Sequence, residues 1–353
     1  MDLRIVVTLL VSTTLALASC GDAGGDAGGD AGAEAWRTGD ERLETRGLVW
    51  ASRTEIHLGD GTTLDTGDPV RSYVVTPGGA YVVPDTGTDE QRYPELVRVT
   101  ARDRRPLGVR PEHDSLTTSP NGRHLAFLDR GGERDDYETP IAEAVVVDLE
   151  TGREIHRSAE GMGDLRTDDL ADLYEDAPPA VIGIDAERAY FLTPGEVIAV
   201  DLDTAEAEVL DDSNAGYHDE PWAEGLGSEP PVDSPDGAWS IVEVPFDDAP
   251  QLARTAGGPP VTTRLTPADV GFGPFEPQPR DLVWTLDSWL DETTAAGIAR
   301  VSASSDGSET FVIVTCSVPD GACRAVPGTE DGAILPESRP GGAVVPTPLP
   351  RTP

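Results

Sequence analysis

The feature that most constrains the fold is a turn-and-strand pattern that recurs along the chain. Ser-Pro-Asn-Gly at residues 119–122 comes directly before the apolar stretch 124–128. A second apolar stretch then ends in Asp-Leu-Glu-Thr-Gly at residues 148–152. Turn residues of this kind, between short runs rich in β-branched side chains, are typical of antiparallel β-hairpins. The pattern therefore predicts a body built from repeated hairpins.

Further copies of the pattern recur along the chain. They begin near residues 55, 76, 96, 185, 196, 234 and 306. The second turns of the first four copies lie about 42 to 52 residues apart, which is close to the period of four-stranded propeller blades with loop insertions. The last turn, at Gly321, lies 117 residues after the fourth, which corresponds to about two units with one degraded copy between them. A ring of blades also protects the edges of its strands. We therefore predict an all-β fold, a β-propeller of about six four-stranded blades over residues 47–330, with two β-sandwiches as the alternative.

Three motifs add a family resemblance. Ser-Pro-[Asn/Asp]-Gly before an apolar strand, followed by Val-Asp-Leu-x-Thr in the next hairpin, resembles the six-bladed TolB-like and WD40-like β-propellers of exported bacterial proteins. The stretch 289–294 resembles a strand lead-in of the same group, and the final Cys-x6-Cys hairpin resembles actinobacterial members. The stretch 245–280 departs from the pattern because it has no clean hairpin. The resemblance implies a fold and says almost nothing about function.

The first residues have the layout of an export signal. Residues 1–19 combine a short basic start with an apolar core that is too short to span a bilayer as a mature helix. They end in a motif that resembles the bacterial lipobox, formed by Leu17, Ala18, Ser19 and Cys20. The resemblance implies cleavage before Cys20 and a lipid anchor on its sulfur. We expect a protein held by this lipid on the extracytoplasmic face of the cell membrane.

Low-complexity segments flank the predicted propeller. Residues 20–46 begin with the lipidated cysteine and a Gly-Asp-Ala-Gly repeat, which is typical of a flexible tether. Residues 331–353 are rich in proline, which predicts a disordered tail. The pattern at 164–176 favours a short inserted helix, and residues 211–231 and 247–280 are expected to be loops.

The chain has three cysteines, an odd number for an exported protein. Lipidation of Cys20 would leave Cys316 and Cys323 as a pair. In a hairpin centred between residues 319 and 320 these two cysteines face each other, whereas a bulge at Gly321 would place them on opposite faces. An oxidising compartment favours the bond, so we predict a Cys316–Cys323 disulfide.

The charge of the chain restricts its partners. There are 26 basic and 65 acidic residues, which give a net charge of −39. A field of this sign repels the phosphates of nucleic acids and of anionic lipids. We therefore exclude nucleic acid as a partner and assign membrane attachment to the lipid on Cys20. The acidity favours solubility, with binding of a cation or a cationic ligand as the alternative.

A search for catalytic motifs finds no Gly-x-Ser-x-Gly, His-Glu-x-x-His, P-loop or Gly-x-Gly-x-x-Gly pattern. We therefore assign no catalytic residue, although a triad defined only by geometry stays open. One acidic group includes a histidine: Asp211, Asp212, His218, Asp219 and Glu220. Its oxygen ligands suit Ca²⁺, and the alternative is a solvated loop.

Two further expectations concern charged and titratable side chains. The acidic stretch 129–136 contains two arginines, which we expect to neutralise it locally. His124 is expected to pack within a strand, and His57 and His156 are expected to lie at the surface of hairpins.

These observations support two hypotheses of function. The first is a membrane-anchored, non-enzymatic binding module that presents its loops to a protein, peptide or glycan. The second is a propeller hydrolase or lyase with a metal-assisted site at the central channel, which would need several acidic or imidazole side chains to converge there.

Overall fold

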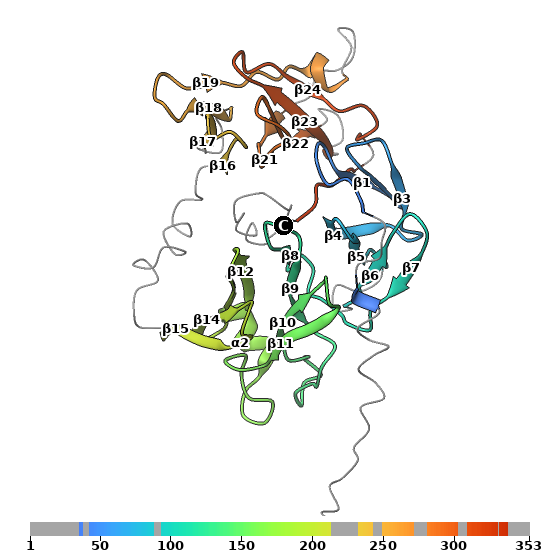
Figure 1. The fold of residues 1–353 in the computed structure, drawn as a ribbon, viewed down its shortest axis with the longest axis vertical. Coiled ribbons are helices and arrows are strands. Elements are labelled where there is room, and N and C mark those ends of the chain that lie inside the picture. Colours follow the sequence, from blue (N-terminus) through green and yellow to red (C-terminus); the bar gives the residue numbers. More distant parts are fainter. Residues whose placement is uncertain are drawn as a thin grey trace, which may run out of the picture.

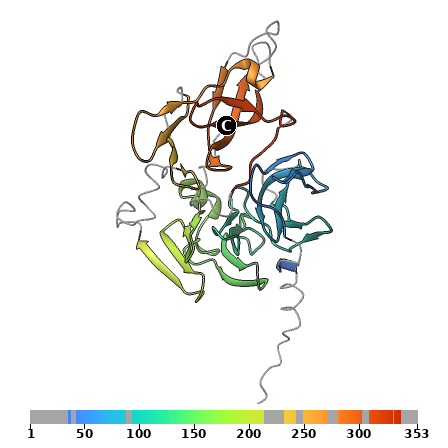
Figure 2. The same cartoon turned by 45° about the horizontal axis from the view of Figure 1, so that its top comes forward.

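The computed structural model describes residues 35–37, 42–87, 93–212, 232–242, 249–271, 281–302, 309–330 and 332–337. Its strands form six antiparallel sheets arranged around a common centre (Figure 1, Figure 2). The fold is a β-propeller with six blades, as the period of the turns predicts. The alternative of two sandwiches is wrong, because the sheets follow one another around a ring rather than pairing face to face.

The first three blades occupy the part of the chain before the helix. Blade 1 contains β1 (Trp50–Ser52), β2 (Glu55–His57) and β3 (Thr63–Asp65). Blade 2 contains β4 (Val70–Thr76), β5 (Gly79–Pro84), β6 (Val97–Val99) and β7 (Arg104–Pro106). Blade 3 contains β8 (Thr117–Thr118), β9 (His124–Asp129), β10 (Glu143–Asp148) and β11 (Arg153–Ser158).

The predicted helix, α2 (Leu170–Asp176), lies between blades 3 and 4. Blade 4 contains β12 (Ala180–Ile184), β13 (Arg188–Leu192), β14 (Glu196–Asp201) and β15 (Ala207–Asp212). Blade 5 contains β16 (Val232–Asp233), β17 (Trp239–Val242), β18 (Gln251–Arg254) and β19 (Val261–Thr262). After the short helix η3 (Pro267–Val270), blade 6 contains β20 (Asp281–Trp284), β21 (Ser288–Trp289), β22 (Thr294–Ser302), β23 (Glu309–Ser317) and β24 (Cys323–Ala325).

The Ser-Pro-[Asn/Asp]-Gly motif forms the same turn in two blades. In blade 3 the Ser119 hydroxyl contacts Asn121 Oδ1 at 2.7 Å and accepts the backbone N–H of His124 at 2.9 Å. In blade 5 Ser234 makes the equivalent bonds, to Asp236 and from the N–H of Trp239. Gly122 closes the first turn at φ 67°, a conformation that favours glycine. The motif therefore fixes where the second strand begins in blades 3 and 5.

Apolar side chains pack between neighbouring blades. One cluster joins blades 1 and 2 through residues such as Ile56 and Tyr73, and a second joins blades 2 and 3 around Phe127. A third joins blades 3 and 4 around Phe191, and a fourth joins blades 5 and 6 around Leu252. Burial of both faces of these sheets explains why their strands are continuous apolar runs rather than alternating ones.

The chain after blade 6 returns to blade 1. Ile334 and Ala51 exchange two backbone hydrogen bonds of 2.9 Å, so Ile334 forms an isolated antiparallel bridge beside β1. In Figure 1 this red segment runs toward the centre of the ring. The predicted disordered tail, residues 331–353, therefore includes a segment that packs on the propeller, through the bridge at Ile334 and the buried side chain of Ala333. Residues 338–353 lie outside the described part of the chain.

The predicted tether also includes a packed residue. Trp36 is only 6 % exposed, and its ring stacks on Tyr81 and Phe127 at centroid distances of 6.0 and 5.9 Å. The Tyr81 hydroxyl donates to the Trp36 carbonyl at 3.2 Å. The predicted tether, residues 20–46, is therefore too long. Trp36 precedes blade 1 in the chain, but its indole packs in the core between blades 2 and 3.

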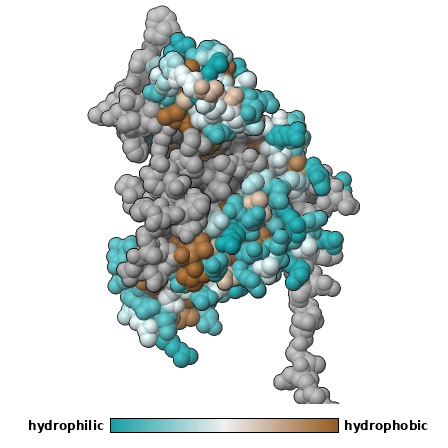
Figure 3. Space-filling view, turned by 60° about the vertical axis from the view of Figure 1, so that its left-hand side comes forward, coloured by the Kyte–Doolittle hydropathy of each residue, from teal (hydrophilic) through white to brown (hydrophobic). Residues whose placement is uncertain are grey.

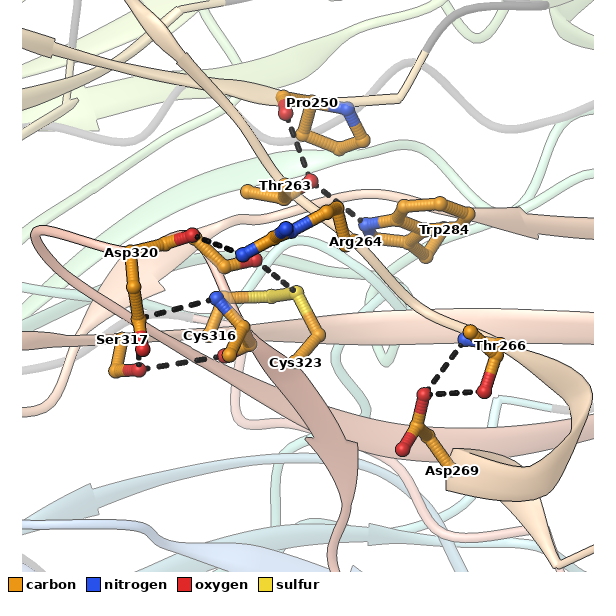
Figure 4. Close-up of a disulfide and its surroundings, with 12 residues drawn as sticks. Pro250, Thr263, Arg264, Thr266, Asp269, Trp284, Cys316, Ser317, Asp320 and Cys323 are labelled. Atoms are coloured by element: carbon orange, nitrogen blue, oxygen red, sulfur yellow. Dashed lines mark hydrogen bonds between the residues drawn. A yellow bond between two sulfur atoms is a disulfide. The ribbon is translucent and has the colours of Figure 1, made fainter.

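The stretch predicted as a loop at 247–280 contains β18 and β19, the outer strands of blade 5. The segment that follows lies against the outer edge of blade 6, where Arg264 pairs in parallel with Ala322 (Figure 4). Thr263 connects the two blades, since its hydroxyl donates to Pro250 O at 2.7 Å and accepts from Trp284 Nε1 at 3.1 Å. Sequence patterning missed these short strands because blade 5 contains polar interruptions.

The last hairpin holds a disulfide between Cys316 and Cys323 (Figure 4). The two residues are directly opposed in the register of β23 and β24, and their Cα atoms are 4.1 Å apart. Gly321 adopts φ 66° in the turn without shifting this register. The bond closes the edge of blade 6 beside Arg264, whose guanidinium donates to Asp320 O at 3.0 Å.

Candidate binding face

The up-and-down order of strands gives the propeller two different faces. Tight turns such as 119–123 and 149–152 join strands on one face, which we call the turn face. The other face, which we call the connection face, holds the longer segments. These segments join the second strand of a blade to the third, and one blade to the next. Long connections on a rigid scaffold are the usual location of binding residues. The described part of the connection face centres on residues 130–142, between β9 and β10.

Within this connection, residues 133–141 form a small hairpin that we call the knuckle. Arg134 pairs with Pro140, and the N–H of Ile141 donates to Glu133 O at 2.9 Å. The N–H of Asp135 donates to Thr139 O at 3.0 Å. Backbone hydrogen bonds therefore run along the knuckle up to its tip, where Tyr137 projects.

The carboxylate of Asp135 fixes both the tip of the knuckle and helix α2. Its Oδ1 accepts the backbone N–H groups of Tyr137 at 3.0 Å and of Thr139 at 2.8 Å. Its Oδ2 accepts the N–H of Leu170 at 2.9 Å, at the start of α2. Burial raises the pKa of Asp135, but these three N–H donors outweigh burial and hold the pKa below its usual value. One carboxylate therefore ties the knuckle to the start of α2.

Arg130 supports the base of the knuckle. Its side chain is 4 % exposed, and it pairs with Glu112 at 2.7 Å and donates to Pro140 O at 3.1 Å. The guanidinium lies 4.4 Å from the ring centre of Tyr174 in α2 and 5.6 Å from that of Tyr93. Burial raises the pKa of both tyrosines, so their rings stay neutral and suit a cation–π contact. One arginine therefore joins four segments of the connection face.

A second arginine supports the knuckle from β11. Arg157 lies 2.8 Å from Asp129 Oδ2, and it also pairs with Glu143 and Glu154. Burial lowers the pKa of Arg157, but the three carboxylates outweigh burial and raise it above its usual value. The prediction that the acidic stretch 129–136 is neutralised by its own arginines is wrong. Asp129 pairs with Arg157, and Arg130 pairs with Glu112, because the strands bring distant charges together.

Tyr137 stands out on this surface. Its side chain is 69 % exposed, the largest value among the exposed large hydrophobic residues in the described ranges. Glu133, Asp136 and Glu138 around it are also exposed, as is Arg134, whose guanidinium donates to the Glu138 carbonyl. The face of the molecule drawn in Figure 3 is mainly hydrophilic, with hydrophobic residues gathered in a few patches. A fixed, exposed tyrosine within acidic surroundings can contact a partner without first losing conformational freedom.

The metal candidates are not brought together by the described structure. Asp211 and Asp212 lie at the end of β15, and their side chains are not described. His218, Asp219 and Glu220 lie outside the described residues. Among the residues that are described, no group of three His, Cys, Asp or Glu side chains is placed to hold a metal ion.

The lipobox residues Leu17, Ala18, Ser19 and Cys20 also lie outside the described ranges. Within those ranges, no helix is long and apolar enough to cross a membrane. Membrane attachment through Cys20 therefore stays a prediction from the sequence.

The histidines follow the predicted packing in part. His124 is buried in β9, and burial lowers its pKa. His57 is partly exposed and stacks on Trp50 at 3.8 Å. His156 was expected at the surface and is partly exposed, but its Nε2 atom is buried, and burial lowers its pKa.

Sequence reasoning missed Tyr137 and Arg130. The signal in the sequence that could have found them is the length of the segment 130–142, which is longer than the tight turns before and after it. An aromatic residue within a charged segment of this kind has no core to join, so it can be expected at the surface.

Comparisons with known proteins identify no family for this chain. No protein-family model matches the chain, and no curated protein matches it. A nidogen/laminin complex matches with a TM-score of 0.30 and 10 % identity, over 77 % of this chain and 89 % of that chain. A puromycin hydrolase mutant matches with a TM-score of 0.28 and 15 % identity, over 83 % of this chain and half (50 %) of that chain.

A third match is a putative 6-phosphogluconolactonase from Bacteroides uniformis, with a TM-score of 0.25 and 14 % identity, over 87 % of this chain and 84 % of that chain. At these scores the likeness says nothing about activity.

Proposed function

We propose that the protein is a lipid-anchored, extracytoplasmic binding module, which contacts a protein partner through the knuckle on its connection face. The observation that carries the proposal is the exposed Tyr137 at the tip of a hairpin that Asp135 and Arg130 hold rigid. Tyrosine and arginine are frequent among the residues that dominate binding energy at interfaces. The motifs of the sequence agree with an actinobacterial-type lipoprotein that has a TolB-like or WD40-like propeller.

The charge of the surface suggests the chemistry of the partner. Three exposed acidic side chains and one exposed arginine, Arg134, flank Tyr137, and the whole chain has a net charge of −39. A partner with basic residues would be attracted over a distance, and one of its cationic side chains could lie over the Tyr137 ring. The association should therefore weaken at high salt concentration.

The anchor can be tested by metabolic labelling with an alkyne analogue of palmitate in a bacterial host that makes lipoproteins. We expect the wild-type chain to take up the label and Cys20→Ala to take up none. A wild-type chain without label would contradict the anchored location, and it would leave the binding face untested.

The binding face can be tested with two matched variants. Tyr137→Ala removes the exposed ring of the knuckle, and Phe311→Ala removes another exposed ring, on β23 of blade 6, where 39 % of the residue is accessible. Some proteins should copurify specifically with the wild-type chain from detergent-solubilised membranes. We expect their recovery to fall at least tenfold with Tyr137→Ala and to stay unchanged with Phe311→Ala. Equal recovery with both variants would contradict the assignment of the knuckle.

A further inference from the structure

The acidic charge of the chain is not spread evenly over the propeller. Residues 35–110, which include blades 1 and 2, contain 11 arginines and 12 acidic residues. Residues 111–353 contain 14 arginines and 48 acidic residues. The field that repels anionic surfaces therefore comes mainly from the part of the chain after blade 2, and blades 1 and 2 are close to neutral.

The most basic stretch of the chain belongs to blade 2. Residues 97–110 contain five arginines and a single acidic residue, Asp103, and the arginines at positions 102, 104, 105 and 110 are exposed. Two nearby carboxylates offset part of this charge, since Asp68 pairs with Arg104 at 3.1 Å and Glu95 accepts the N–H of Gly108 at 2.7 Å. An excess of positive charge remains after both are counted.

Two of these arginines face each other across β6 and β7. Arg98 and Arg105 are directly opposed in the register, and Arg98 is also opposed to Tyr81 of β5. Opposed residues point to the same face of a sheet, so the three side chains form a row across blade 2. Like charges directly opposite each other destabilise a sheet, so this pair is unfavourable without an anion beside it.

Arg98 is the buried member of the pair. Only 7 % of the residue is exposed, its Nη2 atom donates to Gly78 O at 2.9 Å, and its Nε atom is buried without a hydrogen bond. Among the described residues, no carboxylate forms an ion pair with this guanidinium. Buried charges are usually paired. An anion that approaches the exposed Arg105 would therefore also be attracted by the charge of Arg98.

The row lies beside the point where the N-terminal segment reaches the propeller. Trp36 stacks on Tyr81 at 6.0 Å, in the same cluster as the two apolar residues that follow β7, and the next residue, Arg37, is exposed. Figure 1 and Figure 2 both show residues 35–37 beside this part of blade 2. Cys20 is 16 residues before Trp36, a length of chain that spans at most about 55 Å. A lipid on Cys20 would therefore hold this rim close to the bilayer.

We propose that Arg105, Arg98 and Arg37 form a contact surface for anionic phospholipid headgroups, which turns the rim of blade 2 toward the membrane. A guanidinium group can donate two parallel hydrogen bonds to a phosphate, and basic residues close to an anionic bilayer are attracted to its surface. Blades 4 to 6, across the ring, would then face away from the bilayer. The inference rests on the lipid anchor of the proposed function and is independent of the knuckle.

Hydrogen exchange on vesicles tests this surface without depending on lipidation in the cell. The mature chain, which begins at Cys20, can be coupled through the Cys20 thiol to maleimide phosphatidylethanolamine, because Cys316 and Cys323 are joined in a disulfide. The two vesicle types are phosphatidylcholine alone and phosphatidylcholine with about 30 % phosphatidylglycerol, which supplies the anionic surface. We expect exchange in peptides that span residues 97–106 to be about threefold slower on the anionic vesicles at low salt and equal on both at high salt, with blade 4 unchanged.

Two matched variants assign the effect to the arginine row. Arg105→Gln removes the exposed charge of the pair, and Arg153→Gln removes an exposed arginine at the start of β11, the outer strand of blade 3. We expect the difference between the two vesicle types to disappear in Arg105→Gln and to persist in Arg153→Gln. Equal exchange on both vesicle types in the wild type, or the same result in both variants, would overturn the proposal. A wild-type chain that takes up no palmitate analogue in cells would contradict the anchored location and leave the result on coupled vesicles unchanged.

Discussion

The guanidinium of Arg130 lies over the ring of Tyr174, 4.4 Å from its centre, and joins the base of the knuckle to helix α2. The same side chain pairs with Glu112 at 2.7 Å. These contacts connect the end of β9, the β7–β8 connection and the segment between blades 3 and 4. The exposed tip of the knuckle is therefore supported by a buried cation rather than by apolar packing alone.

Arg130→Met should destabilise the fold, because it leaves Glu112 without its partner and removes the donor to Pro140. Removal of one member of a buried ion pair costs about 3 kcal/mol. Urea unfolding measures the loss. The exposed Arg153→Met is the control and should change the free energy of unfolding by less than about 0.5 kcal/mol. A stable Arg130→Met protein would contradict the role of this side chain.

Trp36→Ala should destabilise blades 2 and 3, although Trp36 precedes the first strand. Its ring packs on Tyr81 and Phe127 with 6 % of the residue exposed. Truncation of a buried tryptophan costs about 3–5 kcal/mol. Denaturant unfolding followed by circular dichroism measures the effect, with the exposed Arg37→Ala as the control. Equal stability of the two variants would place Trp36 outside the core.

Replacement of both Cys316 and Cys323 by serine should lower the stability by about 2.5 kcal/mol, because the bond closes a short loop. The hairpin itself should persist, since β23 pairs along its whole length with β22. Urea unfolding of the double variant and of the reduced wild type should give the same loss. If only one of these two proteins lost stability, the disulfide would not be what stabilises this hairpin.

His124→Leu should make the protein less sensitive to acid. Both ring nitrogens of His124 are buried without a hydrogen bond, and burial lowers its pKa, an effect that the nearby Asp148 opposes. A histidine with a lowered pKa is neutral in the folded state, so the wild type should lose stability as the pH falls below about 6.5, where the unfolded chain binds the proton.

Melting temperatures at pH 7.5 and pH 5 measure this effect. The wild type should lose more than His124→Leu, because leucine cannot take up a proton. Parallel losses in the two proteins would show that burial of His124 does not limit acid stability.

Turn chemistry made much of the fold predictable. Local sequence predicts the Ser119 and Ser234 turns, the period of the hairpins and the helix at 170–176. Each of these depends on hydrogen bonds between backbone groups that are close in the chain. The short strands of blade 5 and the return of Ile334 to Ala51 were not predictable in this way. They depend on pairing between distant segments that carry little apolar pattern of their own.

The candidate site was harder to predict for the same reason. Tyr137 sits in a charged stretch, and only the structure shows that Asp135 and Arg130 fix it. The partner of each charge lies on another connection, so the stretch 129–136 alone gives no indication of which pairs form. The acidic group around His218 remains a prediction from the sequence.

The most direct test of the account places a photoreactive amino acid at position 137 of the knuckle and, separately, at position 150, on the turn face of the same blade. Irradiation of intact cells should give a discrete cross-linked protein from position 137 and none from position 150, with the yield at position 137 reduced in high salt. The same cross-links from both positions, or none from position 137, would contradict binding through the knuckle.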